Sequence, residues 1–172
     1  MFEFNPHPPV SAIPGVLFCA AFILEMLALL YRSETLRNSV RVIVTLAIIL
    51  TPITYLTGYL GATAARNELT AIDIAESEKN PASAKTELLD ERIEVHRATG
   101  RLLLFSIFPL GLFTLLSQMK DQLTGENAAR IAEMLFRLFL IITVISALST
   151  SYLGGRLVFS YGAGVSAKHL KN

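Results

Sequence analysis

Four long stretches almost free of charge constrain the fold of this 172-residue chain more than any other feature. They cover 10–31, 42–65, 102–119 and 138–155, and Glu25 is the only acidic or basic residue inside them. A helix needs about 20 apolar residues to cross the hydrocarbon core of a bilayer, and each stretch reaches this length once snorkelling Arg101 and Arg137 extend the last two. The sequence therefore predicts an all-α fold, an integral membrane four-helix bundle with spanning helices at about 10–31, 40–65, 98–119 and 134–155.

The segment 66–97 between the second and third stretches is charged but has apolar residues at helical spacing. Leu69, Ile72 and Ala75 precede a break at Asn80-Pro81, and the same spacing resumes at Leu88. This pattern predicts an extramembrane helical hairpin that continues the second and third helices. Its eight acidic residues form either a solvated face or a docking surface for a cationic partner. With the tail 156–172, we expect one transmembrane domain over 1–172.

Composition excludes several classes of protein. Hydrophobic residues make up 52% and charged residues 17% of the chain, which departs from soluble domains in the direction of membrane proteins. The single Cys19 excludes an intrachain disulfide framework, and a net charge of +1 without a long basic run disfavours nucleic-acid binding. No nucleophile motif or phosphate-binding glycine loop occurs, so we assign no catalytic residue. The expected partners are the lipid bilayer and other membrane or redox subunits, and a homo-oligomer is an open alternative.

Four crossings place both termini and the segment 66–97 on one side of the membrane, here named side B, and the two short loops on side A. The short loops carry five basic residues: Arg32, Arg37, Arg41, Lys120 and Arg130. Orientation follows the density of Lys and Arg in short loops, which predicts that side A is cytoplasmic. The start of the chain lacks the basic region of a signal peptide, so we expect no cleavage.

His96 is the first candidate for chemistry. It lies on a seam with Ile93, Gly100 and Leu103, so the imidazole is expected to face other helices, with Gly100 leaving space beside it. An inward histidine at the membrane edge is a haem ligand, a metal ligand, a proton-transfer group or a structural hydrogen-bonding group. His7 enters the first helix from the same side, so the two are candidate axial ligands of a b-type haem, whose iron is the only metal we expect. His169 in the tail is expected to be solvated.

Two tyrosines and a threonine-rich stretch at side B allow two interpretations. Tyr59 follows Thr51, Thr54 and Thr57 at the end of the second helix, and Tyr152 lies near the end of the fourth. Small and hydroxyl residues at this spacing are typical of helix packing faces. The functional alternative is that both tyrosines form a wall of a cofactor or quinone pocket.

Two charges lie inside the helices near side A. Glu25 and Arg137 are both about 9 to 10 Å from the side-A ends of their helices. An unpaired charge at this depth costs several kcal/mol, so we predict an intramembrane ion pair, with Glu133 as a competing partner for Arg137. The pair either locks the first helix to the fourth or belongs to a proton path.

Four segments resemble, in order and spacing, the DUF2231 family of four-helix bacterial membrane proteins: HPPVSAIP at 7–14, TGYLGATAA at 57–65, HRATGR at 96–101 and GGRLVFSYGAGV at 154–165. His7, Pro8, Pro14, His96, Gly154, Gly155 and Gly162 match the motifs of this family. Ala12 and Tyr161 stand where many members have histidines. The resemblance implies a multi-pass protein of the bacterial inner (cytoplasmic) membrane, and relatives fused to Rieske or c-type cytochrome domains suggest respiratory electron transfer.

These expectations support two functions. The first is a redox-associated membrane module that binds a b-type haem on side B through His96 and His7. The second is a cofactor-free accessory or anchoring subunit of a larger membrane complex. Four helices with two intramembrane charges and no inverted repeat disfavour a transporter. If side A is cytoplasmic, both termini and the 66–101 loop are periplasmic.

Overall fold

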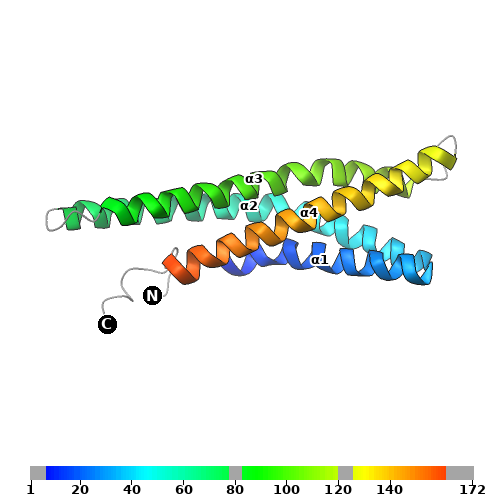
Figure 1. The fold of residues 1–172 in the computed structure, drawn as a ribbon, viewed down its shortest axis with the longest axis horizontal. Coiled ribbons are helices and arrows are strands. Elements are labelled where there is room, and N and C mark those ends of the chain that lie inside the picture. The colour runs from blue at the N-terminus through cyan, green and yellow to red at the C-terminus, as the bar shows by residue number, and fades with distance from the viewer. Residues whose placement is uncertain (1–6, 78–82, 120–125, 162–172) are drawn as a thin grey trace.

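The computed structural model describes residues 7–77, 83–119 and 126–161, and within them the side chains of 12–60, 91–119 and 126–157. This part of the chain is all-helical. It forms four helices: α1 (His7–Tyr31), α2 (Glu34–Ser77), α3 (Ser83–Gln118) and α4 (Glu126–Tyr161) (Figure 1). Each contains a stretch long and apolar enough to cross a membrane. The prediction of an all-α protein with four such helices is therefore confirmed.

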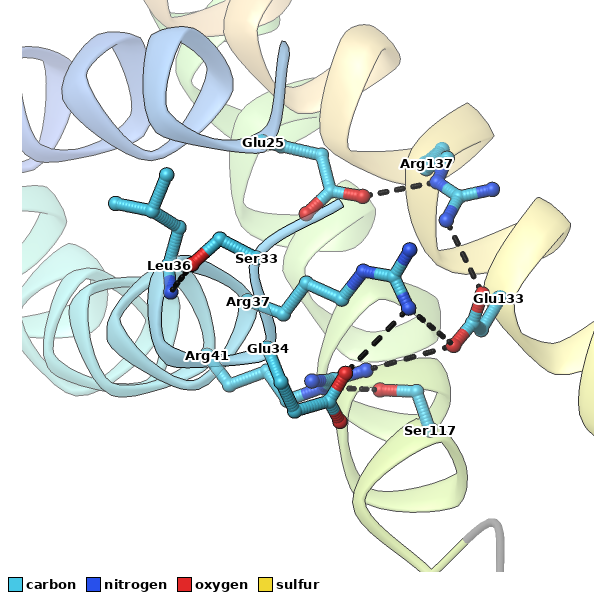
Figure 2. Close-up of polar contacts among 9 residues, drawn as sticks. All are labelled: Glu25, Ser33, Glu34, Leu36, Arg37, Arg41, Ser117, Glu133 and Arg137. Carbon is cyan, nitrogen blue, oxygen red and sulfur yellow. Dashed lines mark hydrogen bonds and ion pairs between the residues drawn. The ribbon is translucent and has the colours of Figure 1, made fainter. Parts of the chain in front are cut away.

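A turn of two residues joins α1 to α2. Arg32 adopts a positive φ of 51°, and the Ser33 backbone N–H donates to the Ala28 carbonyl oxygen at 3.2 Å, which closes the end of α1. The Ser33 hydroxyl then accepts a hydrogen bond from the Leu36 N–H at 3.3 Å and so caps the start of α2 (Figure 2). The segment from Glu34 to Arg41, which the sequence analysis assigned mainly to a short loop, is thus helical.

The helices α2 and α3 extend together past the end of the bundle at which α1 begins and α4 ends (Figure 1). The length of α2 is 44 residues, against 25 for α1. Helical structure continues through the charged residues because backbone hydrogen bonds within a helix do not depend on the polarity of its side chains. The expected break at Asn80-Pro81 and the side chains of Leu69, Ile72 and Leu88 lie outside the described residues.

Packing is closest between neighbours in the chain, with α1 mainly against α2 and α3 mainly against α4. Phe18, Val44, Leu110 and Leu140 contribute one residue per helix to a shared hydrophobic core. A hydrogen bond from Thr143 to the Ser106 hydroxyl oxygen, 3.2 Å long, joins α4 to α3 inside this core. Small hydroxyl side chains of this kind let two helices approach closely and form hydrogen bonds with each other.

Several polar side chains are buried beside the hydrophobic core, and many large apolar side chains lie on the outside of the bundle. Glu25, Arg41 and Thr143 are buried, whereas Leu30, Phe105 and Phe108 are about two-thirds or more exposed, at 72%, 67% and 67%. All four helices carry such exposed apolar residues. Soluble proteins rarely expose continuous apolar surface on this scale.

Candidate functional site

The most polar part of the interior is an ion-pair network near the α1–α2 turn (Figure 2). The Arg137 Nε of α4 donates to the Glu25 Oε1 of α1 at 2.8 Å, and the Arg137 Nη2 lies 3.1 Å from the Glu133 Oε2 one turn earlier. The Glu25 side chain is only 4% exposed. The structure therefore brings together Glu25 and Arg137, which the sequence analysis paired because they lie at equal depth. Glu133 also contacts Arg137.

Two further arginines of α2 join this network. The Arg37 Nη1 and the Arg41 Nη2 each lie 3.9 Å from the Glu133 Oε1, and Arg37 also contacts the exposed Glu34 at 3.5 Å. The Arg41 side chain is 7% exposed, and its Nε donates to the Ser117 hydroxyl oxygen of α3 at 3.0 Å. Contacts of Arg37, Arg41, Glu25 and Ser117 thus link all four helices at one level.

Among the described residues, the charges of this network balance. Three guanidinium groups, from Arg37, Arg41 and Arg137, face three carboxylates, from Glu25, Glu34 and Glu133. A buried charge is tolerated when it is both paired and hydrogen-bonded, and the chain meets this condition for the deepest members, Glu25 and Arg41. Such an arrangement fixes the relative positions of helices.

Sequence reasoning missed Arg37 and Arg41, which it counted among the residues of a short basic loop. A signal was available, because Arg41 lies three residues before Val44 and six before Ala47, on the buried face of α2. Because charged residues were taken to mark the ends of the spanning segments, the position of Arg41 on the buried face of α2 was missed. The partners Ser117 and Glu133 are distant in the chain, so spacing alone does not identify them.

At the opposite end, His96 of α3 packs against α4. A Cβ atom added at Gly154 would lie 3.0 Å from the His96 Cε1 and 3.6 Å from both ring nitrogens. The Cε1 edge of the imidazole therefore lies directly over Gly154. The expectation that His96 faces another helix agrees with this contact, but the glycine that accommodates the ring is Gly154 of α4.

Gly100 serves a different neighbour. A Cβ atom at Gly100 would lie 3.7 Å from two carbons of the Tyr55 ring of α2, so this glycine admits a tyrosine. Tyr55 was not among the predicted site residues.

The two predicted tyrosines, Tyr59 and Tyr152, both lie on the surface. Tyr59 is exposed, and the Arg97 guanidinium lies 5.6 Å from the centroid of its ring, a cation–π contact. Tyr152 is 65% exposed. Both tyrosine side chains thus lie on the outside of the bundle, and their role at a cofactor pocket stays a prediction.

The buried threonines of α2 form hydrogen bonds within their own helix. Thr51 and Thr54 are buried, which fits a packing face, but their hydroxyls donate to carbonyl oxygens of α2 itself, at Ala47 and Thr51. Hydroxyl groups satisfied within their own helix can be buried without a partner on another helix.

The structure describes only one of the two candidate haem ligands with its side chain, His96. His7 begins α1, but its side chain lies outside the described residues, as does all of His169. A small, partly open cavity lined by Arg92, Leu153, Arg156 and Leu157 has a volume of about 10 Å³, room for about one water. No group of three His, Cys, Asp or Glu side chains in the described region is arranged to hold a metal ion.

Comparison with known proteins adds no assignment. A scan against protein-family models, a search of curated proteins and a search of solved structures each found no match to the chain.

Proposed function

We propose that the chain is an integral membrane protein that serves as a cofactor-free accessory or anchoring subunit of a larger membrane complex. The observation that carries the membrane part of this proposal is the apolar exterior of the bundle, where Leu30, Phe105 and Phe108 are exposed while Glu25 and Arg41 are buried. Exposed apolar side chains on all four helices match the hydrocarbon core of a bilayer.

The extension of α2 and α3 supports the anchoring role. At 1.5 Å per residue the 44 residues of α2 measure about 66 Å, roughly twice the hydrocarbon thickness. We propose that the part beyond the bundle is an extramembrane hairpin. Its charged sequence between 66 and 97 offers a polar docking surface to a neighbouring subunit.

The ion-pair network supports a static role in the membrane. Its charges balance, and its contacts link four helices, which suits a rigid scaffold. A transport path would need polar groups that can exchange partners with a solute or a proton along the bundle. We therefore favour the interpretation that the Glu25–Arg137 pair locks α1 to α4.

For the location we propose the bacterial inner membrane, with both termini and the hairpin periplasmic. The bacterial location rests on the resemblance to the DUF2231 family. The orientation rests on the short basic loops at side A, since the turn at Arg32 and the first turns of α2 and α4 carry basic residues close to the membrane end.

The anchoring proposal is tested by native electrophoresis of membranes extracted in mild detergent. The chain should resist alkaline carbonate extraction and migrate in a complex larger than the 18.9 kDa chain with its detergent. Glu91→Lys, at an exposed position of α3, should reduce this association. Glu126→Lys, at the opposite end of the bundle, should not. Release by carbonate overturns the membrane proposal, and migration alone or only with copies of itself overturns the subunit proposal.

The redox-associated function with a b-type haem stays a prediction and is separated from the anchoring role by an absorption spectrum. If the anchoring role holds, the protein purified from a haem-replete host should show no Soret band. A Soret band that disappears in His96→Ala would reverse this choice and make electron transfer the leading function.

A further inference from the structure

The anchoring role does not involve the small cavity between α3 and α4. Arg92 and Leu153 line it together with Arg156 and Leu157, so α3 and α4 each contribute one arginine. The cavity has room for about one water, and its mouth opens to solvent. Two guanidinium groups therefore border one small cleft that has leucines on its α4 side.

Arg92 and Arg156 lack the contacts that the other two described arginines of α3 make. Arg101 forms an ion pair with Glu94 at 2.8 Å, and Arg97 lies over the Tyr59 ring. In the described residues no carboxylate pairs with Arg92 or Arg156, and the buried Arg92 Nε has no hydrogen-bond partner there, which is also true of the Nε atoms of Arg37 and Arg97. A buried guanidinium N–H without an acceptor is costly, which favours an anionic ligand.

The cleft lies where the apolar part of α4 ends. Arg156 is the first charged residue after the uncharged stretch 138–155. If the chain spans a membrane, as proposed above, this position corresponds to the headgroup layer.

We propose that Arg92 and Arg156 form a binding site for a phosphate-bearing anion, supplied by the headgroup of an anionic phospholipid. Guanidinium groups bind phosphate oxygens bidentately, which satisfies N–H donors and neutralises both charges of the pair. The small enclosed volume fits a ligand whose phosphate lies at the mouth of the cleft. Free inorganic phosphate has the same chemistry, so the experiment separates the two sources.

The test is native mass spectrometry of the full chain in detergent, titrated with phosphatidylglycerol or with phosphatidylcholine. Wild-type protein should retain phosphatidylglycerol preferentially. Arg92→Gln and Arg156→Gln should each weaken this binding about fivefold. Arg101→Gln is the matched control, because it removes the same charge from the same end of the bundle but from an arginine paired with Glu94. Equal thermal unfolding of the variants shows that they are folded.

The outcomes are distinct. Equal losses in Arg92→Gln and Arg101→Gln would mean general charge attraction and would overturn the site. Inorganic phosphate that stabilises the wild type but not the Arg92→Gln protein, without a lipid preference, would keep the anion site and overturn the lipid source. No preference for either ligand overturns the proposal. Carbonate extraction reports separately on membrane insertion, so its failure is not confused with failure of the anion site.

Discussion

At the scale of single residues, the Glu25–Arg137 pair is asymmetric. Arg137 has a second carboxylate at Glu133, whereas Arg137 is the only described cation in contact with Glu25. Arg137→Gln strands a carboxylate that is 4% exposed, and Glu25→Gln leaves an arginine that is still paired. Losing one partner of a buried pair therefore has two different consequences at this site.

We expect Arg137→Gln to lower the free energy of unfolding in detergent by about 3 to 5 kcal/mol and Glu25→Gln by about 1 to 2 kcal/mol. The double variant should lose less than the sum, because neither charge is then stranded. Denaturant titration followed by circular dichroism measures all three changes. Additive losses, or a larger loss for Glu25→Gln, would contradict the pairing geometry.

Gly154 is a second residue where one methyl group decides packing. Gly154→Ala places a Cβ 3.0 Å from the His96 ring, so α3 and α4 must separate or the imidazole must move. We expect a loss of about 1 to 3 kcal/mol in the same measurement, and most of it should be recovered in Gly154→Ala with His96→Ala. Gly155→Ala is the control, since its Cβ meets nothing within 4 Å and alanine favours the helix. Equal effects at the two glycines would show that His96 does not pack there.

At the scale of elements, the α1–α2 turn combines a strained and a favourable residue. Arg32 has a positive φ, where glycine avoids a steric cost, and Ser33 caps α2. Arg32→Gly should therefore raise the free energy of unfolding by about 1 kcal/mol, and Ser33→Ala should lower it by about 1 kcal/mol. Thermal unfolding in detergent measures both. A destabilised Arg32→Gly protein would indicate that the arginine side chain has a stabilising contact.

The elements show how much of the fold the sequence determines. Stretches without charge identify all four helices, because desolvating an isolated charge is costly. The same rule misplaces their ends: α4 starts at Glu126, eight residues before the predicted start near 134, and α2 starts at Glu34 instead of near 40. The rule also conceals Arg41, whose burial depends on Ser117 and Glu133 from distant helices.

The candidate sites were predictable in unequal degree. Equal depth pairs Glu25 with Arg137 because two charges at one level of a bundle stabilise each other. The neighbour of His96 was not predictable from its own helix, since the heptad spacing gives a face but not the residue opposite, Gly154. The cleft at Arg92 and Arg156 depends on the register between α3 and α4, which no local pattern contains.

At the scale of the whole molecule, the remaining question is which end faces the cytoplasm. The end with the two-residue turn carries Arg32 and Arg130, and basic residues near short turns resist translocation. The opposite end carries the long α2–α3 extension (Figure 1). We therefore expect the extension to be accessible from outside the inner membrane. In a Cys19→Ala background, cysteine at Ser77, the last residue of α2, should react with an impermeant maleimide in cells with a permeabilised outer membrane. Cysteine at Asn127, exposed in the first turn of α4, should react only after the inner membrane is disrupted.

The reverse pattern would invert the orientation and leave the four-helix fold unchanged. Equal labelling of both sites in intact inner membranes would contradict the spanning bundle, because a closed bilayer separates the two ends of every crossing helix.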